Sequence, residues 1–253
     1  MASPPLDALP SGYYPACMET AERTAAAPRA SGRSRWARRV GTALIVLGVG
    51  VLAWTLVVWQ WNDPFTSLYT RWQQRQLESD YAALVEQQPP PPKPSVATGA
   101  PAPDPEAVIR AEATRFRKSV GEGDAIGRIV IPRLGVNMIV VNGTDTDTLK
   151  KGPGRYLGTS MPGQGQLVYI AGHRTTYGAP FAKIDEMRPG DRFRIEMPYA
   201  TFTYEVTGHR IVDDQDLSVL ESKGFEQVAL QACHPRFFAT QRYIVYAKPV
   251  SAT

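Results

Sequence analysis

Cys233 and Arg242 are two residues near the C-terminus that could do chemistry together. Cys233 ends one strand-like run, and Arg242 begins the next. Residues 228–233 and 242–248 alternate as strands do, and a polar turn with Pro235 separates them. If the two strands pair antiparallel, Cys233 at the end of the first lies beside Arg242 at the start of the second. A guanidinium favours the thiolate form of a neighbouring thiol and can hold an oxyanion, so the pair indicates nucleophilic catalysis. The alternative is that Cys233 is a small buried apolar residue.

A histidine often serves as the acid or base beside a catalytic thiol, and the chain has three. His173 follows an apolar strand-like run and a glycine, where a loop could expose it. His234 follows Cys233 directly and would point to the other side of an extended chain, which makes it a poor general base for that thiol. His209 falls in an alternating run and is interpreted as a surface or packing residue. The sequence therefore predicts a thiol-transferase constellation of His173, Cys233 and Arg242.

Short strands separated by turn signals make up the region that must position these three residues. Between residues 125 and 253 the pattern predicts an all-β domain of seven or eight short strands, which is typical of an antiparallel barrel or sandwich. Short helical segments are expected at 144–151 and 218–222. The expected strands are residues 127–132, 136–141, 166–171, 192–197, 201–211, 227–233 and 242–248.

An uncharged apolar run at residues 40–59 has about the length that a helix needs to cross a bilayer. The first charge after it is Asp63, and the positive-inside rule therefore puts the N-terminus in the cytoplasm and the later residues outside the cell. A cleaved signal peptide is the alternative. It is disfavoured because the run is long and no small-x-small cleavage site follows it. Five arginines crowd the sequence before the run: Arg29, Arg33, Arg35, Arg38 and Arg39.

Changes in composition along the sequence divide the chain into five segments. We expect a disordered cytoplasmic tail at 1–39, a transmembrane helix at 40–61 and a helical stalk at 62–86. A proline-rich linker with a short helix is expected at 87–124, ahead of the catalytic domain at 125–253. The net charge is +4 and the pI is near 9.1, but the arginines are dispersed and no basic patch is interleaved with aromatic residues. Nucleic-acid binding is therefore excluded as a function.

The two cysteines fall on opposite sides of the predicted membrane span. Cys17 would be cytoplasmic and Cys233 external, so they cannot pair within one chain and Cys233 is expected to be a free, reactive thiol. Acidic side chains in two loops could bind calcium, but solvated loops are the preferred interpretation, and we expect no metal. These acidic residues are Asp145, Asp147, Asp213, Asp214 and Asp216.

Three tracts carry a resemblance to a known family. They read G-R-I-V-I-P at 127–132, A-G-H-R-T-T-Y-G-A-P-F at 171–181 and C-H-P-R-F-F-A-T-Q-R at 233–242, and the run at 149–163 fits as well. Together they resemble the sortases, membrane-anchored cysteine transpeptidases of Gram-positive bacteria, and are most similar to the class E group of actinobacteria. The resemblance covers the whole external domain. It implies a sortase-like antiparallel β-barrel of seven to eight strands with short helices.

The resemblance also implies roles for particular residues. The catalytic residues would be His173, Cys233 and Arg242. The substrate contacts would include Ala232, Tyr177 and Arg174. One departure concerns the run before the nucleophile, because sortases usually carry T-L-x-T-C there and this chain reads A-L-Q-A-C at 229–233, with alanine at both threonine positions. This departure puts the substrate preference in doubt but leaves the catalytic residues intact.

The reaction implied by the family is transpeptidation. Cys233 would attack the threonine carbonyl of an L-P/A-x-T-G-like C-terminal sorting signal on a secreted protein, and an amine would resolve the thioester. That amine would come from lipid II, peptidoglycan or a pilin lysine, and no cofactor is required. Two other classes remain open. An L,D-transpeptidase would show S-H-G-C where this chain has C-H-P, and a catalytically degenerate, membrane-tethered binding or scaffold domain would suit the altered A-L-Q-A-C.

Overall fold

The computed structural model describes residues 32–61, 64–87 and 104–253, and its contacts divide the chain into two units, Met1–Val51 and Leu52–Thr253. The first described element is helix α1 (Gly32–Trp61), within which Arg35–Val57 is long and apolar enough to cross a membrane. The prediction that residues up to 39 are disordered is wrong for 32–39, since arginine and alanine are good helix formers and extend the apolar helix upstream. The rest of the predicted tail and the predicted linker at 88–103 lie outside the described residues.

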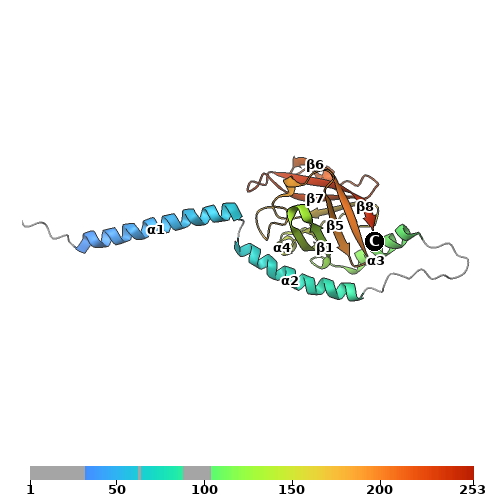
Figure 1. Cartoon of the computed structure of the whole chain (residues 1–253), viewed down its shortest axis with the longest axis horizontal. Coiled ribbons are helices and arrows are strands. Elements are labelled where there is room, and N and C mark those ends of the chain that lie inside the picture. Colours follow the sequence, from blue (N-terminus) through green and yellow to red (C-terminus); the bar gives the residue numbers. More distant parts are fainter. Residues whose placement is uncertain (1–31, 62–63, 88–103) are drawn as a thin grey trace, which may run out of the picture. The chain divides into compact units, whose positions relative to one another are not determined.

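Helix α2 (Pro64–Gln87) occupies the predicted stalk, and it packs along the outside of the barrel instead of standing free (Figure 1). Thr70 and Leu77 on one side of α2 are buried. The Gln74 side chain bonds the backbone of a barrel residue in both directions. Its Oε1 accepts from the Ile139 N–H at 2.7 Å, and its Nε2 donates to the Ile139 carbonyl at 3.0 Å. Gln74 thus acts as a substitute strand partner, which fixes α2 on the barrel.

Helix α3 (Pro105–Ser119) confirms the short helix expected before the barrel. Asp104 caps its N-terminus by accepting from the Glu106 N–H, and the proline at its start suits the first helical turn. Ala113 and Phe116 on one side of α3 are buried against the barrel core. Both α2 and α3 therefore belong to the same packed unit as the domain predicted at 125–253.

A closed barrel of eight strands forms the core of the described residues, in the order β1-β2-β3-β4-β7-β8-β6-β5, and confirms the predicted barrel (Figure 1). Short helices α4 (Thr146–Lys151), η1 (Pro132–Leu134), η2 (Ile184–Glu186) and η3 (Leu217–Leu220) connect the strands. The strands are β1 (Ala125–Ile131), β2 (Val136–Asn142), β3 (Gly154–Arg155), β4 (Leu167–Ala171), β5 (Arg192–Met197), β6 (Ala200–Asp213), β7 (Gln227–His234) and β8 (Gln241–Ala252).

Two of the eight strand contacts are parallel, although the sequence predicts an antiparallel barrel. β2 pairs parallel with β3, and β4 pairs parallel with β7, while the other six contacts are antiparallel. The β4–β7 contact is parallel because the chain crosses over through β5 and β6 before it returns beside β4. The sequence patterns also missed β3, which is only two residues long.

Side chains alternate between the two faces of the barrel wall. Val228, Leu230 and Ala232 of β7 belong to the large buried cluster inside the barrel. Ala229 belongs instead to a second cluster, together with Tyr169 of β4. Because successive strand residues point to opposite faces, this second cluster covers the outer face of β4, β7 and β8.

Candidate active site

Strand register brings the ends of three strands together at one edge of the barrel. β7 lies between β4 and β8, and Cys233 of β7 is the direct register partner of Arg242 of β8. On the other side of β7, Ala171 of β4 is level with Gln231, and a bond from the Gly172 N–H to the Gln231 carbonyl, 3.0 Å long, extends this ladder. His173 follows two residues after Ala171, as Cys233 follows two residues after Gln231. The loop that carries His173 therefore leaves β4 at the barrel edge where Cys233 and Arg242 lie.

Cys233 and Arg242 also share one face of the wall. Ala229 and Ile244 belong to the outer cluster. Cys233 lies four residues after Ala229 on β7, and Arg242 lies two residues before Ile244 on β8. Because side chains alternate along a strand, Cys233 and Arg242 point to the same outer face. Cys233 is a free cysteine of intermediate exposure. The thiol and the guanidinium are thus presented on the outer surface of the barrel wall, where a substrate can reach them.

His173 is half-buried in the loop after β4, and three contacts define its place. Its ring lies 5.1 Å from the Tyr177 ring, and its carbonyl accepts from the Phe181 N–H at 3.1 Å. The fully buried Phe181 ring packs so closely on Gly172 that an added Cβ would come within 2.7 Å of it, which explains the glycine before the histidine. The loop that carries His173 is therefore folded back on itself around a buried aromatic anchor.

The environment of the His173 ring favours its neutral form. Burial lowers the pKa of His173 below its ordinary value. Its Nε2 atom is buried and makes no hydrogen bond within the described part of the chain. Buried polar atoms normally have a hydrogen-bond partner. The unpartnered Nε2 of His173 can therefore accept a proton from a substrate or from the thiol.

Arg242 is oriented by its own turn. Its Nη1 donates to the Ala239 carbonyl at 2.8 Å and to the Gln241 carbonyl at 3.0 Å. Its Nη2 lies 3.8 Å from a carboxylate oxygen of Asp214 on the loop after β6. These contacts hold the guanidinium at the start of β8 beside Cys233, with donors left over for a substrate oxygen.

Arg174, a predicted substrate contact, lies in the interior of the domain. Its side chain is only 3% exposed, because every part of the guanidinium is engaged internally. Nη1 donates to the carbonyl of Cys233 at 3.3 Å and lies 3.0 Å from His234 Nδ1, and Nη2 pairs with Asp185 at 2.7 Å. Arg174 therefore ties the His173 loop to the backbone of the nucleophile and to η2, which is a positioning role.

Ala232 was also predicted to contact substrate, and it does not reach the surface. It is fully buried in the barrel interior, opposite Tyr243 of β8. The reason is strand alternation, which turns residue 232 inward when Cys233 is turned outward. His234 likewise lies on the face away from Cys233, against Arg174 and Tyr243, as the sequence indicated.

Tyr177, the third predicted substrate contact, lies between His173 and helix α2. Its backbone has a φ of 52°, and its N–H donates to Thr66 Oγ1 of α2 at 2.8 Å. Its ring meets the Tyr69 ring of α2 edge-on at 6.4 Å. A chain of contacts therefore runs from α2 through Tyr177 to the catalytic histidine.

Tyr169 and Asp214 were not singled out by the sequence analysis as parts of the site. Tyr169 lies on the outer face of β4, and burial raises its pKa, while the nearby Arg242 lowers it and Cys233 raises it. Tyr169 is the register partner of Ala229 of β7, so it lies on the outer face that also carries Cys233 and Arg242. Its position two periods before His173 on an alternating strand was the available signal. Asp214 was considered only as a possible calcium ligand, and the contact with Arg242 depends on the fold.

The acidic loops have structural uses. Asp145 caps the N-terminus of α4 and Asp216 caps η3, and hydrogen bonds to the capped residues lower the pKa of each carboxyl. In the described ranges, no group of three potential ligands is placed to hold a metal ion. Asp145 and Asp216 thus have capping roles, and the solvated-loop interpretation of the acidic residues stays a prediction.

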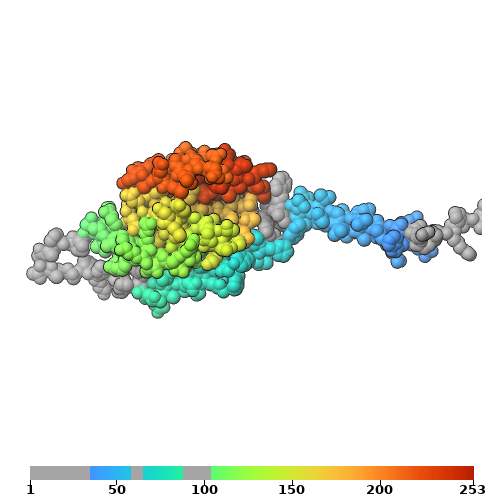
Figure 2. Space-filling view, turned by 180° about the vertical axis from the view of Figure 1, so that it is seen from behind, coloured from blue at the N-terminus to red at the C-terminus, as the bar shows by residue number. Residues whose placement is uncertain are grey.

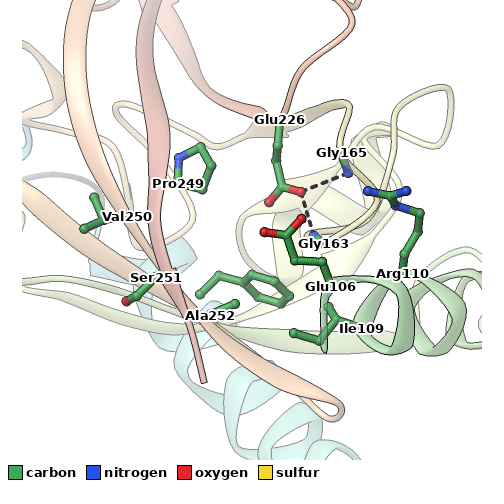
Figure 3. Close-up of a pocket in the computed structure, with 11 residues that line it drawn as sticks. Glu106, Ile109, Arg110, Gly163, Gly165, Glu226, Pro249, Val250, Ser251 and Ala252 are labelled. Atoms are coloured by element: carbon green, nitrogen blue, oxygen red, sulfur yellow. Dashed lines mark hydrogen bonds between the residues drawn. The ribbon is translucent and has the colours of Figure 1, made fainter. Parts of the chain in front are cut away.

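A separate cavity of about 320 Å³ lies at the other end of β7 (Figure 3). Its central group is Glu226, just before β7 begins. Two backbone N–H groups, of Gly163 and Gly165, donate to one carboxylate oxygen at 3.0 Å each, and the Tyr204 hydroxyl donates to the other at 2.7 Å. Glu226 is therefore occupied in bracing the loop before β4, and this cavity is remote from Cys233, which lies at the opposite end of the strand.

Comparisons with known proteins agree with this fold and site. The family model of the Sortase domain matches residues 129–250. Sortase D of Bacillus subtilis is 35% identical over 133 residues, which are 51% of this chain and 66% of that protein. Sortase SrtE1 of Streptomyces coelicolor is 30% identical over 156 residues, which are 55% of this chain and 44% of that protein. The solved structure of the SrtA sortase from Actinomyces oris has 31% identity and a TM-score of 0.50, over 53% of this chain and 84% of that one.

The chain belongs to the sortase family, which is a family of cysteine transpeptidases. The similarity spans about two thirds or less of the length of the two curated relatives. Those relatives carry the names of different sortase groups, so the comparisons establish the family and leave the assignment to class E as an expectation.

Proposed function

We propose that this chain is a membrane-anchored sortase that cleaves an L-P/A-x-T-G-like sorting signal between threonine and glycine and transfers the protein to a cell-wall amine. The observation that supports the proposal is the register pairing of Cys233 with Arg242 at the barrel edge where the His173 loop leaves β4. Family membership supports the type of reaction. We also keep the class E assignment as part of the proposal, on the tracts that carry it.

In the first half-reaction the Cys233 thiolate attacks the carbonyl carbon of the threonine, and a carbon–sulfur bond forms. The negative charge that develops on the carbonyl oxygen is stabilised by the free donors of the Arg242 guanidinium. The carbon–nitrogen bond to glycine then breaks, and His173 donates its proton to the leaving amine. The product is a thioester on Cys233 together with the glycine-side peptide.

In the second half-reaction an amine attacks the thioester and His173 accepts its proton. A new carbon–nitrogen bond forms and the Cys233 thiolate leaves, so the enzyme returns to its initial state. Because burial lowers the pKa of His173, the enzyme that holds both thiolate and imidazolium is a minor form at neutral pH. No cofactor takes part in these steps.

The proposed location follows from α1. Arg35–Val57 would anchor the chain, with the arginine-rich N-terminus in the cytoplasm and the barrel outside. The partners would be secreted proteins that carry a sorting signal, and lipid II, a peptidoglycan amine or a pilin lysine. The alternative is a tethered scaffold that has lost catalysis. The paired placement of Cys233 with Arg242 argues against it, because such a scaffold does not need both groups.

The test uses the full chain in detergent or nanodiscs with peptides of the L-P-x-T-G and L-A-x-T-G types. We expect cleavage between threonine and glycine, faster release when an amine is added, and no cleavage by the Cys233→Ala variant. The ratio of rates for the two peptide types measures the preference that the altered A-L-Q-A-C run puts in doubt. Binding of peptides without any cleavage would support the scaffold and contradict the proposal.

A further inference from the structure

Helix α2 has two different faces, and only one of them is used by the barrel. Thr70 and Leu77 on the inner face are buried. On the opposite face, Leu68 is 62% exposed and Trp72 is 51% exposed, and these two residues are four apart, so they form one continuous stripe. Figure 2 shows α2, in cyan, along the lower edge of the barrel.

The exposed stripe has the composition of a membrane interface. Leucine and tryptophan are flanked by Arg71 and Arg75, which are exposed and make no ion pair with a carboxylate among the described residues. Tryptophan prefers the boundary between lipid chains and water, and arginine beside an apolar face is attracted to anionic headgroups. The combination of these residue types, rather than the exposed apolar area alone, is what matches a membrane interface.

The position of the stripe in the chain favours lipid over other partners. The stripe begins eleven residues after Val57, the last residue of the segment that could cross a membrane, so a bilayer is within reach of a short connection. A second copy of the chain fits less well, because a self-contact through this stripe would bring Arg71 and Arg75 of the two copies together and like charges repel. The apolar stripe is also small, since Leu68 and Trp72 span about one turn of the helix.

We propose that the outer face of α2, formed by Leu68, Arg71, Trp72 and Arg75, lies on the anionic surface of the bilayer. This goes beyond anchoring by α1, because it sets which side of the barrel faces the membrane. It rests on the anchoring in the proposed function. The inner face of the same helix holds Tyr177 through Thr66, so lipid contact by α2 would keep the His173 loop close to the membrane surface.

The experiment places one fluorescent probe at a time on the full chain in nanodiscs that contain phosphatidylglycerol. In a background without the native cysteines (Cys17→Ser, Cys233→Ala), a nitrobenzoxadiazole probe is attached to Leu68→Cys, to Lys223→Cys on the barrel surface as a matched control, or to Leu52→Cys in α1. Quenching by lipids that carry a nitroxide near the headgroup is then measured. All three positions are exposed, so the substitutions should not disturb folding.

We expect the probe at position 68 to be quenched at least about threefold more strongly than the probe at 223. Changing both arginines, Arg71→Gln and Arg75→Gln, should reduce this quenching. Nanodiscs that contain only phosphatidylcholine should also reduce it. Equal quenching at 68 and 223 would overturn the proposal. Probe shielding that grows with protein concentration in detergent would also overturn it, in favour of a second copy. Weak quenching of the probe at position 52 would contradict anchoring by α1, which is a separate failure. The proposal for α2 is still tested by comparing the quenching at position 68 with that at position 223.

Discussion

The two sides of the active site are held in place by different means. Cys233 and Arg242 are nine residues apart along the turn that joins β7 and β8, and direct register pairing sets them side by side. His173 comes from a loop sixty residues earlier, beyond the end of β4. Its place depends on the internal bonds of Arg174 and on the contact of Tyr177 with α2. One side is thus a local consequence of a hairpin, and the other depends on the packed fold.

The two kinds of support determine which substitutions should alter the reaction step itself and which should alter the rate by displacing a catalytic side chain. A change at Arg242 leaves the hairpin register intact and should affect the reaction alone. A change at a residue that supports the His173 loop should alter the rate by moving the histidine, with little effect on the chemistry of Cys233.

Replacing the proton donor should have the largest effect of these changes. We expect His173→Gln to lower kcat by about 10²–10⁴, the range associated with the loss of a general acid. Single-turnover cleavage of a sorting peptide measures this. The variant His209→Gln, on the exposed part of β6, serves as the control and should keep its activity. A loss below about tenfold would remove His173 from the proton-transfer role.

The same variant tests the burial of the imidazole. Burial lowers the pKa of His173, so the unfolded chain takes up the proton at a higher pH than the folded chain does. The folded protein therefore loses stability as the pH falls below the ordinary value of 6.5. We expect the melting temperature of His173→Gln to fall less than that of the parent between about pH 7 and about pH 5. Equal falls would show that the ring is not buried in the neutral form.

Arg242 distinguishes charge from geometry. A lysine keeps the positive charge but loses the planar paired donors, so Arg242→Lys should lower kcat by about 10²–10³, the scale of losing one oxyanion donor. Alkylation of Cys233 by a small reagent should remain complete in this variant, because the thiol stays accessible. Arg210→Lys on the neighbouring strand β6 provides the control. A rate close to that of the parent for Arg242→Lys would mean that Arg242 acts as a point charge.

The support given by α2 should have a smaller effect. Thr66→Val keeps the shape of the side chain but removes the acceptor for the Tyr177 N–H. Loss of one such hydrogen bond corresponds to about 0.5–1.5 kcal/mol, so we expect kcat to fall by up to about tenfold with KM unchanged. Thr114→Val on α3 is the matched control, since its hydroxyl bonds only within its own helix and to Gln164. Full activity in a chain that lacks α2 would show that the His173 loop needs no support from it.

The smallest effect on catalysis is expected at residue 232. Because Ala232 is fully buried, Ala232→Thr should destabilise the fold by about 1–3 kcal/mol through overpacking, without changing the preference between peptides. Chemical denaturation and the ratio of rates for the two peptide types separate these outcomes. A changed preference at unchanged stability would show that residue 232 reaches the substrate.

The contrast between the two sides also explains what could be predicted from sequence. Alternation in residues 227–248 is strong, and it predicted both the pairing of β7 with β8 and the meeting of Cys233 with Arg242. The position of the His173 loop beside β7 could not be predicted from alternation. It depends on the parallel pairing of β4 with β7, which are separated in the sequence by β5 and β6. No local pattern carries such a long-range contact.

Residues outside the strands were predicted less well for the same reason. Arg174 stands next to the histidine in a family tract, which suggested substrate contact, but its donors are all directed inward by the packing of η2 and β7. The sequence predicted a helix at 62–86, yet it did not tell which surface that helix covers. Gln74 and Tyr177 connect α2 to the barrel through contacts between distant parts of the chain.

The proposed function depends on acylation of Cys233 by a sorting peptide, with help from His173 and Arg242. Intact mass spectrometry of the full chain, with Cys17→Ala to leave one thiol, measures this most directly after mixing with a peptide and rapid acid quenching. We expect a mass gain equal to the peptide fragment up to threonine, its removal by hydroxylamine, and its assignment to Cys233. Turnover of the peptide by a Cys233→Ala variant, or an adduct on another residue, would contradict the account.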